Sequence, residues 1–421
     1  MARILMTIIG RPEKDRDAEA SGAYRTTTYR IPDGEGVPAG ESSRTLFSGW
    51  ALLEMGSFDE VIILGTEGSR WELLFEKAKE KMTPNEQQFL AQLFSATEEH
   101  KADEAILIPL APVLSKHLGV SVQLRIIPGG ASQEEQFNIL KVVADTVGVG
   151  DRLTLDLSHG FRHLPILMFS AALYLKSVKN IEVDKVYSSF HSSDKGYAEL
   201  FDLAGLLRIS DWSSALSKFE TNDDARVFVP LLQKDGAPNR ILGELEKSGF
   251  AAQIHNYHSA MSHERNAASQ LEGEPLNGLS GVFQQNLRDY LRRCDVRNPA
   301  EHLLLRAEGH LRHNNYDRAA IVGDIAFIAA LAGPRERYWQ YQVEQRIRAD
   351  MEAGRRGNSQ LQSAAREIHR IRNDFAHLNA FRNHGPNPFQ SEETLGGCIG
   401  EALLKLREYL SQGRSVQYRS R

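Results

Sequence analysis

The order of apolar and amphipathic segments constrains the fold of this chain most strongly. In the first half, short apolar runs alternate with segments whose apolar residues recur at helical spacing. The apolar runs are RILMTIIG, DEVIILG, VQLRIIP, RLTLDLS and IEVDKVYSSF. Strands that alternate with helices are typical of a mostly parallel sheet with helices on both faces. The sequence therefore predicts an α/β domain in the first half.

One segment between these runs carries a clear helix signal. Ser132 followed by Glu135 is the pattern of a capping box, and Ile139, Val143 and Val147 then share one face. The segment therefore predicts a helix that begins at Ser132 and packs on the sheet. By contrast, the long polar segment 15–41 contains several Gly and Pro residues. We expect it to be a loop at the ligand-binding edge of the sheet.

The pattern changes after about Asp202, where the remaining long segments all favour helix. One predicted helix contains RIRNDFAHLN and ends before HGPNP, and a last helix runs from about Thr394 to Leu410. The chain is thus expected to be α/β in its N-terminal half and all-α in its C-terminal half.

Composition limits the class of protein. A chain of 421 residues suggests two or three domains, and a formal charge of −5 argues against broad binding to duplex DNA. No apolar run is long enough to span a bilayer. The apolar N-terminus lacks a signal-peptide cleavage site, which favours a buried first strand and a cytoplasmic protein. Cys294 and Cys398 are too far apart for a metal-binding pattern.

Four of the predicted strands end in turns that contain glycine. In an open parallel sheet, ligands bind outside the carboxyl ends of the strands, and glycine lets the backbone approach them closely. Such turns can also be plain connections, but four at one edge, three of them with Arg, predict a nucleotide-like ligand. The sequence has neither a dinucleotide-binding G-x-G-x-x-G nor a P-loop. The candidate ligand-binding residues are Gly10, Arg11, Thr66, Glu67, Gly68, Ser69, Gly129, Gly130, Ser158, His159, Gly160, Phe161 and Arg162.

The segment RIRNDFAHLN has two interpretations. Its apolar stripe comprises Ile368, Ile371, Phe375 and Leu378, so the rest is either an ordinary charged helix face or half of an active site. Arg372 and His377 are five residues apart, roughly 140° around an ideal helix, so one straight helix cannot bring them into one compact site. Two copies of the helix across a two-fold axis would bring both pairs together.

The residue types in this segment suit RNA cleavage. A histidine such as His377 can move a proton near neutral pH, and an arginine such as Arg372 can bind phosphate and stabilise developing charge. Asn373 can orient either group, and no metal is required. Another histidine group, His255, His258 and His263, lacks the further ligands of a zinc site and is interpreted as a polar helix face.

Two motifs together resemble a known family. The stretch RNDFAH fits the R-x4-6-H signature of HEPN ribonucleases, and LDLSHGFRHLPIL resembles the strand–turn–helix of CARF domains. CARF domains are Rossmann-like sensors of cyclic oligoadenylate in type III CRISPR systems. The chain thus resembles a CRISPR-associated CARF–HEPN ribonuclease. The resemblance divides it into a CARF domain over 1–205, a helical connector over 206–295 and a HEPN domain over 296–421.

The resemblance implies a function. Two CARF domains would bind one cyclic oligoadenylate, with cyclic tetra-adenylate as the expected activator, and paired HEPN domains would form a composite site. The implied catalytic residues are Arg372, His377 and Asn373. They would cleave single-stranded RNA in a homodimer or higher assembly, without metal or cofactor, and leave a 2′,3′-cyclic phosphate in antiviral defence.

The sequence leaves two other functions open. The chain could be a ligand-sensing regulator whose helical half binds DNA or a partner and cuts nothing. It could also be a ring nuclease that degrades cyclic oligoadenylate and uses its helical half only for dimerisation. The reaction products distinguish the three alternatives.

Overall fold

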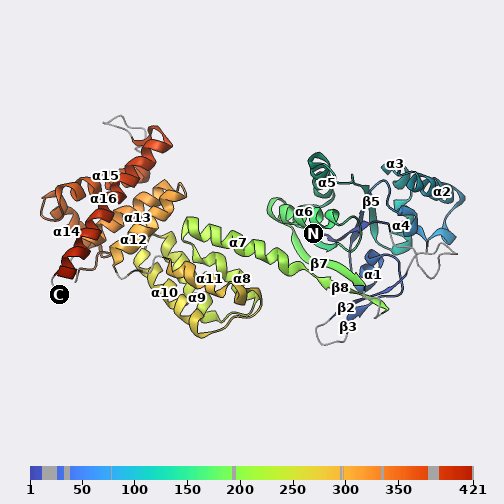
Figure 1. The fold of residues 1–421 in the computed structure, drawn as a ribbon, viewed down its shortest axis with the longest axis horizontal. Coiled ribbons are helices and arrows are strands. Elements are labelled where there is room, and N and C mark those ends of the chain that lie inside the picture. Colours follow the sequence, from blue (N-terminus) through green and yellow to red (C-terminus); the bar gives the residue numbers. More distant parts are fainter. Residues whose placement is uncertain are drawn as a thin grey trace. The chain divides into compact units, whose positions relative to one another are not determined.

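The computed structural model divides into two compact units, Met1–Arg208 and Ile209–Arg421 (Figure 1). It describes residues 1–11, 26–32, 38–76, 78–191, 196–293, 296, 298–332, 336–377 and 388–419, with side chains to Gln412 in the last helix. The first unit is α/β and the second is helical, as the sequence predicts. The predicted division of the helical part at 295/296 stays a prediction.

The first unit contains one mixed sheet with the strand order β3-β2-β8-β7-β6-β1-β4-β5. The strands of the described residues are β1 (Arg3–Ile9), β2 (Thr28–Pro32), β3 (Pro38–Glu41), β4 (Glu60–Gly65), β5 (Ser121–Ile126), β6 (Arg152–Asp156), β7 (Glu182–His191) and β8 (Tyr197–Asp202). Strands β5, β4, β1, β6 and β7 pair in parallel, whereas β8 is antiparallel to β7. These five parallel strands are the five apolar runs of the sequence, and β8 was not predicted.

The prediction of a loop over residues 15–41 is wrong where β2 and β3 form. Strand β2 pairs in parallel with β8, and β3 pairs with β2 in the antiparallel direction. Tyr29 is buried in the core, and its backbone N–H donates to Ser42 Oγ over 3.0 Å. The run Thr28–Ile31 is made of residues that suit a half-buried strand, which outweighs its polar surroundings. Residues 12–25 and 33–37 of the predicted loop lie outside the described residues.

Helices cover both faces of the sheet (Figure 1). On one face lie α5 (Gln133–Thr146) and α6 (His163–Val178), and the other face carries α1 (Ser48–Met55), α2 (Pro84–Glu98), α3 (Glu104–Leu107) and α4 (Ala111–Leu118). Alternate residues of β1 pack against the helices on one face or the other, because successive side chains of a strand point to opposite faces. Ile4, Met6 and Ile8 enter one core, and Leu5 and Ile9 enter the other.

Helix α5 begins at Ser132 as predicted, but its cap differs from the predicted capping box. The Ser132 side chain accepts a hydrogen bond from the Glu135 backbone N–H. The Glu135 carboxylate accepts instead from the backbone N–H of Ala131, over 2.8 Å. Only half of the reciprocal box therefore forms, since the carboxylate reaches one residue further back.

The second unit is built from helices and short 3-10 turns. Its helices are α7 (Ala204–Asn222, which starts before the division), α8 (Val229–Lys234), α9 (Asn239–Gln253), α10 (Tyr257–Gly273), α11 (Gly278–Arg292), α12 (Pro299–Arg312), α13 (Tyr316–Leu331), α14 (Tyr341–Glu352), α15 (Ser359–His377) and α16 (Glu392–Arg419). The 3-10 turns among the described residues of both units are Trp71–Phe75, Lys79–Lys81, Ala225–Phe228 and Pro388–Gln390. The last helix is longer than the predicted Thr394–Leu410.

Two of the helix breaks occur at residues with a left-handed backbone. His255 has φ of 59° between α9 and α10, and Asn314 has φ of 56° between α12 and α13. Residues other than glycine are uncommon in this region, but asparagine and histidine are among those that enter it most often. Neither break is marked by glycine or proline, so the sequence reads as continuous helix at both places.

The helices α12, α13, α15 and α16 pack together around the larger helical core. Ile368 and Ile371 of α15 are fully buried and Phe375 packs beside them, which confirms three members of the predicted apolar stripe. Leu378 lies outside the described residues. At the α13–α15 crossing, a Cβ on Gly323 would lie 2.6 Å from Ile368 Cδ1. Glycine at this position leaves room for the end of the Ile368 side chain where the two helices cross.

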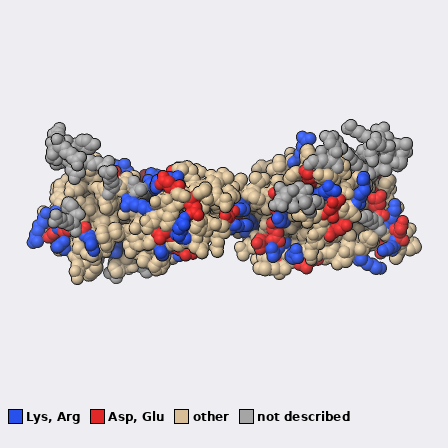
Figure 2. Space-filling view, turned by 90° about the horizontal axis from the view of Figure 1, so that it is seen from below, with Lys and Arg blue, Asp and Glu red and all other residues tan. Residues whose placement is uncertain are grey.

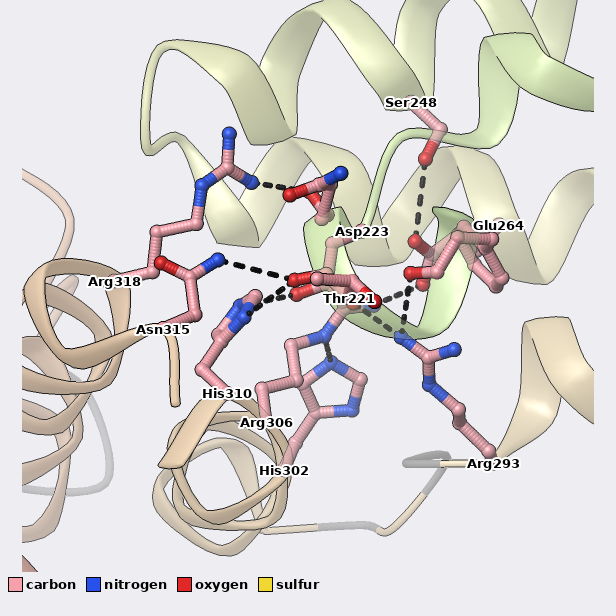
Figure 3. A network of polar contacts seen from close by, with 12 residues as sticks. Thr221, Asp223, Ser248, Glu264, Arg293, His302, Arg306, His310, Asn315 and Arg318 are labelled. Atoms are coloured by element: carbon pink, nitrogen blue, oxygen red, sulfur yellow. Dashed lines mark hydrogen bonds and ion pairs between the residues drawn. The ribbon is translucent and has the colours of Figure 1, made fainter. Parts of the chain in front are cut away.

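A buried ionic cluster links α12 of this core to α10 and to the end of α7 (Figure 3). Arg306 of α12 forms ion pairs with Glu264 of α10 and, over 3.3 Å, with Asp223, which follows α7. His310 Nε2 lies 2.8 Å from Asp223 Oδ2, and Arg293 also pairs with Asp223. Asp223, Glu264, Arg306 and His310 are all buried. Together with Arg293, these four residues form what we call the Arg306 cluster.

The cluster keeps Asp223 ionised. Burial by itself raises the pKa of this carboxyl, but Arg306, His310 and Arg293 outweigh burial and hold the pKa well below its usual range. A depressed folded-state pKa stabilises the native state above the unfolded pKa of about 3.9 and loses that contribution as the pH falls further. Asp223 also has a left-handed backbone, with φ of 55°.

We predict that Asp223→Asn lowers the free energy of unfolding of the second unit by about 3 kcal/mol at pH 7. Asparagine tolerates the left-handed backbone, so the loss reports the charge and not the conformation. The difference from the wild type should shrink below about pH 4, where the wild-type carboxylate also loses its contribution. Urea unfolding of the full chain at several pH values, followed by circular dichroism, measures both effects.

The matched control is Glu308→Gln, which removes an ion pair with Arg407 at the surface of the same unit. Because these side chains are 20% and 53% exposed, we expect the control to cost less than about 1 kcal/mol. Equal losses in the two variants, or a loss in Asp223→Asn that does not change with pH, would contradict the assignment.

Candidate functional site

A cavity of about 460 Å³ lies at the carboxyl ends of β1, β4, β5 and β6. Strand β1 lies between β4 and β6, so the chain turns to opposite sides of β1 at this point, where open sheets bind ligands. We call it the strand-end cavity. Its lining residues are Ile9, Gly10, Arg11, Thr66, Glu67, Gly68, Ser69, His100, Ile127, Pro128, Gly129, Glu135, His159, Gly160, Phe161 and Leu164.

Two glycines in contact form part of the lining of this cavity. A Cβ on Gly10 would lie 2.8 Å from the backbone nitrogen of Gly160, closer than real Cβ atoms come. Gly160 has φ of 94°, and a Cβ there would lie 2.9 Å from Ile8 Cγ2. The turns after β1 and β6 therefore meet backbone to backbone, which only glycine allows.

The turn after β6 is fixed from behind by the buried carboxylate of Asp156. This carboxylate accepts hydrogen bonds from Thr7 Oγ1 over 2.7 Å, Ser48 Oγ over 2.5 Å and the Ser158 backbone N–H over 3.1 Å. It thus ties β1, α1 and the turn after β6 together. The next residues of the turn are held in one position beside the cavity.

His159 is the part of this turn whose chemistry is best defined. Its ring is stacked on Phe47 at 5.5 Å, and its Nε2 accepts from the Ser48 backbone N–H over 3.2 Å. Burial lowers the pKa of His159 although Asp156 opposes this effect. His159 is therefore a neutral, fixed imidazole on the wall of the cavity.

Arg11 supplies the positive charge of the strand-end cavity. Its Nε donates to the Gly68 carbonyl over 2.8 Å, and its Nη2 lies 2.7 Å from His100 Nε2. A Cβ on Gly68 would collide with the His100 ring, so the absence of a side chain at Gly68 leaves room for this ring. Arginine is well suited to bind a phosphate at such a site.

The structure brings most of the sequence-predicted ligand-binding residues to this one cavity, with three exceptions. Gly130 is buried beside His163, and Arg162 is an exposed residue at the start of α6. Ser158 Oγ is buried without a hydrogen-bond partner among the described residues and does not line the cavity. Sequence analysis missed His100 and Glu135, because His100 lies in no strand-end turn and Glu135 was assigned only to the helix cap.

A second cavity, of about 770 Å³, lies in the helical unit, and we call it the helical cavity. Its lining residues are Ile254, His255, Asn256, Tyr257, His258, Asp317, Ile321, Asp324, Ile325, Ile328, Tyr338, Trp339, Glu344, Arg348, Arg372, Phe375 and Ala376. The left-handed break at His255 turns the chain at this wall. The histidines that sequence analysis interpreted as a polar face include His255 and His258, which line this cavity instead.

A chain of polar contacts leads from Arg372 into the helical core. Arg372 Nη1 donates to Asn373 Oδ1 over 2.9 Å, and Asn373 Nδ2 lies 3.0 Å from His369 Nε2. His369 Nδ1 lies 3.2 Å from the carboxylate of Asp324, which also receives Arg348 over 2.7 Å. Asp324 follows Gly323, and His369 follows Ile368, so the close crossing of α13 and α15 makes this contact possible.

The Asp324 carboxylate remains ionised at the end of this chain. Burial raises its pKa, but the hydrogen bond with His369 and the charge of Arg348 outweigh burial and lower the pKa overall. The carboxylate therefore stays negative and orients the His369 ring. Through Asn373, that ring fixes the position of Arg372 at the cavity wall.

His377 occupies a different environment from Arg372. It is the last residue of α15 and is exposed, whereas Arg372 is half-buried and lines the helical cavity. Within one chain, the two residues of the predicted catalytic pair therefore do not share a cavity. This agrees with the angular separation that the sequence predicts.

Charge and hydropathy limit other functions of the described residues. On the face drawn in Figure 2, basic and acidic side chains are interspersed over each unit, without a broad basic patch among the described residues. In the same part of the chain, no group of three or more His, Cys, Asp or Glu residues is arranged to hold a metal ion. None of the described helices has both the length and the apolar character needed to cross a membrane.

Comparison with known proteins identifies the first unit. Residues 4–194 match the family described as CRISPR system endoribonuclease Csx1, CARF domain. The CRISPR-associated protein MJ1674 of Methanocaldococcus jannaschii is 24% identical over 253 residues, which cover 56% of this chain and 39% of that protein. The chain thus spans about two fifths of the length of this relative. It carries an N-terminal CARF domain with a mostly parallel sheet, followed by a mainly helical region.

The contact between Gly10 and Gly160 gives a test of the geometry of the strand-end cavity. We predict that Gly10→Ala lowers the free energy of unfolding by about 1–3 kcal/mol, because its methyl group collides with the Gly160 backbone. Gly129→Ala is the matched control, since its Cβ would meet only Glu135 Oε2 at 3.8 Å. The control should change stability by less than about 0.5 kcal/mol. Equal effects in urea unfolding would show that the glycine contact is not close.

Proposed function

We propose that the chain is a cyclic oligoadenylate-activated, metal-independent endoribonuclease that cleaves single-stranded RNA in type III CRISPR defence. The observation that carries this proposal is the arrangement of Arg372 and His377 on α15. Arg372 is held at a cavity wall by Asn373 and His369, and His377 is exposed at the end of the same helix. The match of the first unit to a CARF domain of an endoribonuclease family supports the same function.

The proposed reaction is attack of the ribose 2′-hydroxyl on the adjacent phosphate. His377 takes the 2′-hydroxyl proton or protonates the departing 5′-oxygen, since an imidazole can both accept and donate a proton. Arg372 binds the phosphate oxygens and stabilises the charge that builds up on them. The products are a 2′,3′-cyclic phosphate and a 5′-hydroxyl. Asn373 positions Arg372 through the 2.9 Å hydrogen bond between their side chains.

A homodimer completes this site. Because Arg372 and His377 do not share a cavity within one chain, we propose that α15 and its copy pair across a two-fold axis. Each composite site then contains both residue types from the two protomers. The exposure of His377 supports this arrangement, since a partner can reach it.

The strand-end cavity is the proposed activator site. A volume of about 460 Å³ suits a ligand the size of a nucleotide, so a ring of four adenylates would be shared between two CARF domains. Arg11 is placed to bind a phosphate, and the exposed ring of Phe161 is placed to stack on an adenine. The ligand activates cleavage if it binds the active arrangement of the dimer more tightly than the inactive one.

We predict that His377→Ala and Arg372→Ala each reduce cleavage of labelled single-stranded RNA by at least about 100-fold, because each removes a group that acts in the transition state. The assay contains EDTA and compares no ring, cyclic tetra-adenylate and cyclic hexa-adenylate. Binding of the ring should be unchanged in both variants.

The control for this experiment is Arg370→Ala on the same helix. Arg370 pairs with Glu367 at the surface, and its loss should leave cleavage within about twofold of the wild type. Cleavage that persists in His377→Ala would overturn the catalytic assignment. Degradation of the cyclic oligoadenylate without any RNA cleavage would instead support the ring nuclease. Binding of the cyclic oligoadenylate without either reaction would support the regulator.

We further predict that Arg11→Ala weakens binding of cyclic tetra-adenylate by about tenfold or more, because a charge-assisted hydrogen bond to phosphate is lost. Calorimetric titration measures the dissociation constant. Arg162→Ala is the matched control, since Arg162 belongs to the same edge of the sheet but does not line the cavity. A larger loss in the control than in Arg11→Ala would refute this orientation of the ligand.

A further inference from the structure

We propose that the helical cavity binds one unpaired base of the RNA, stacked on the paired rings of His258 and Trp339. This inference rests on the proposed function and adds a specificity site to it. It assigns a role to a wall of the cavity, built from the start of α10 and the residues before α14, that neither the catalytic pair nor the CARF domain uses.

The aromatic rings of this wall form a stacking platform. The ring centroids of His258 and Trp339 are 3.7 Å apart, with an angle of 8° between the planes. Tyr338 meets both rings edge-on, at 5.1 Å from Trp339 and 6.2 Å from His258. Tyr338 is buried whereas Trp339 is 45% exposed, so a buried ring supports the platform and an exposed ring is open to a ligand. A planar base can extend such a stack.

Within the described part of the chain, three residues that line this wall also have polar atoms without a partner. His255 Nδ1, His258 Nδ1 and Tyr257 Oη are buried and have no hydrogen-bond partner among the described residues. A buried polar atom without a partner is unfavourable, and its presence often marks a missing ligand or water. The edge of a nucleobase offers both donors and acceptors. The exposed Trp339 ring and the unpartnered polar atoms of this wall thus both favour a nucleobase as the ligand.

The position of the cavity relates this base to the proposed cleavage site. Arg372, Phe375 and Ala376 of α15 line the same cavity as the aromatic platform. A base on the platform would therefore belong to a nucleotide next to the phosphate that Arg372 binds. Its identity would influence where the RNA is cut, since each base presents a different edge.

The chemistry of the cavity favours a base over a docked segment of a second copy. An apolar docking groove would be lined by aliphatic side chains, whereas this cavity is also lined by Arg348, Arg372 and Asp317. Its volume of about 770 Å³ also suits a nucleotide. We therefore commit to RNA as the occupant and treat a second copy as an outcome of the test.

The first experiment measures stacking without cleavage. A single-stranded RNA with one 2-aminopurine, moved along the strand, is titrated with the His377→Ala full chain. Stacking quenches 2-aminopurine, so we expect strong quenching at one position, which disappears when Trp339→Ala is added. The RNA should bind about fivefold or more weakly to that double variant. Trp339→Phe in the same background should retain both effects, and Tyr341→Ala, which removes an exposed aromatic outside the cavity, should change neither.

The second experiment measures the same contact during cleavage by the activated protein. Replacing the base at the quenched position by an abasic site should lower kcat/KM by about fivefold or more in the wild type. In Trp339→Ala, the abasic and normal substrates should be cleaved equally, because the partner of the base is already missing. Most of the change should lie in KM, since the base is held before and during the reaction.

Three results would overturn the inference. Quenching that is equal at all positions would show no fixed base, and an abasic penalty that persists in Trp339→Ala would place the base elsewhere. Dissociation of a dimer by Trp339→Ala in sedimentation, without an effect on quenching, would assign the wall to a second copy. Absence of cleavage in every protein with quenching intact would overturn the proposed function and leave the base site standing.

Discussion

The buried ion pairs of Arg306 are the interaction on which the helical unit depends. Burying a charge is unfavourable unless an opposite charge and hydrogen bonds compensate it, so the two carboxylates around Arg306 must stay in place. These carboxylates come from the end of α7 and from α10, and Arg306 itself belongs to α12. Three segments that are distant in sequence therefore have one favourable arrangement.

The helical cavity depends on the same arrangement through α13. Next to the Arg306 cluster, Asn315 Nδ2 donates to the Thr221 carbonyl over 3.2 Å, and Arg318 donates to the Asn222 carbonyl (Figure 3). Both donors lie at the start of α13, whose later residue Asp324 holds His369. The end of α7 and the position of Arg372 are thus connected by hydrogen bonds and one helix. This connection provides a physical route by which a displacement of α7 would alter the proposed site.

The sequence predicted the parallel core of the sheet well, because long apolar runs and glycine turns are strong local signals. It missed β2 and β3 because these short strands lie in a polar segment with several Gly and Pro residues, and because β2 pairs with β8, which is distant in sequence. The breaks at His255 and Asn314 were also missed, since a left-handed backbone at a residue other than glycine is set by packing and not by local preference.

The strand-end cavity and the helical cavity also differ in how well the sequence predicts them. Candidate residues in strand-end turns converge because parallel strands bring their carboxyl ends to one edge. The aromatic platform joins residues of two separate helical regions, so only the packing of the chain reveals it. Likewise, Asp324 and His369 are 45 residues apart in sequence and meet only where α13 and α15 pack together.

The contact between Gly10 and Gly160 has a mechanical consequence. Where side chains line a site, a small displacement is absorbed when one of them changes rotamer. Two glycines have no rotamers, and their backbones already touch. A ligand that pushes on the turn after β1 must therefore move the turn after β6 as well, together with the start of α6. At this contact, a displacement of one turn passes to the other without being absorbed by a side chain.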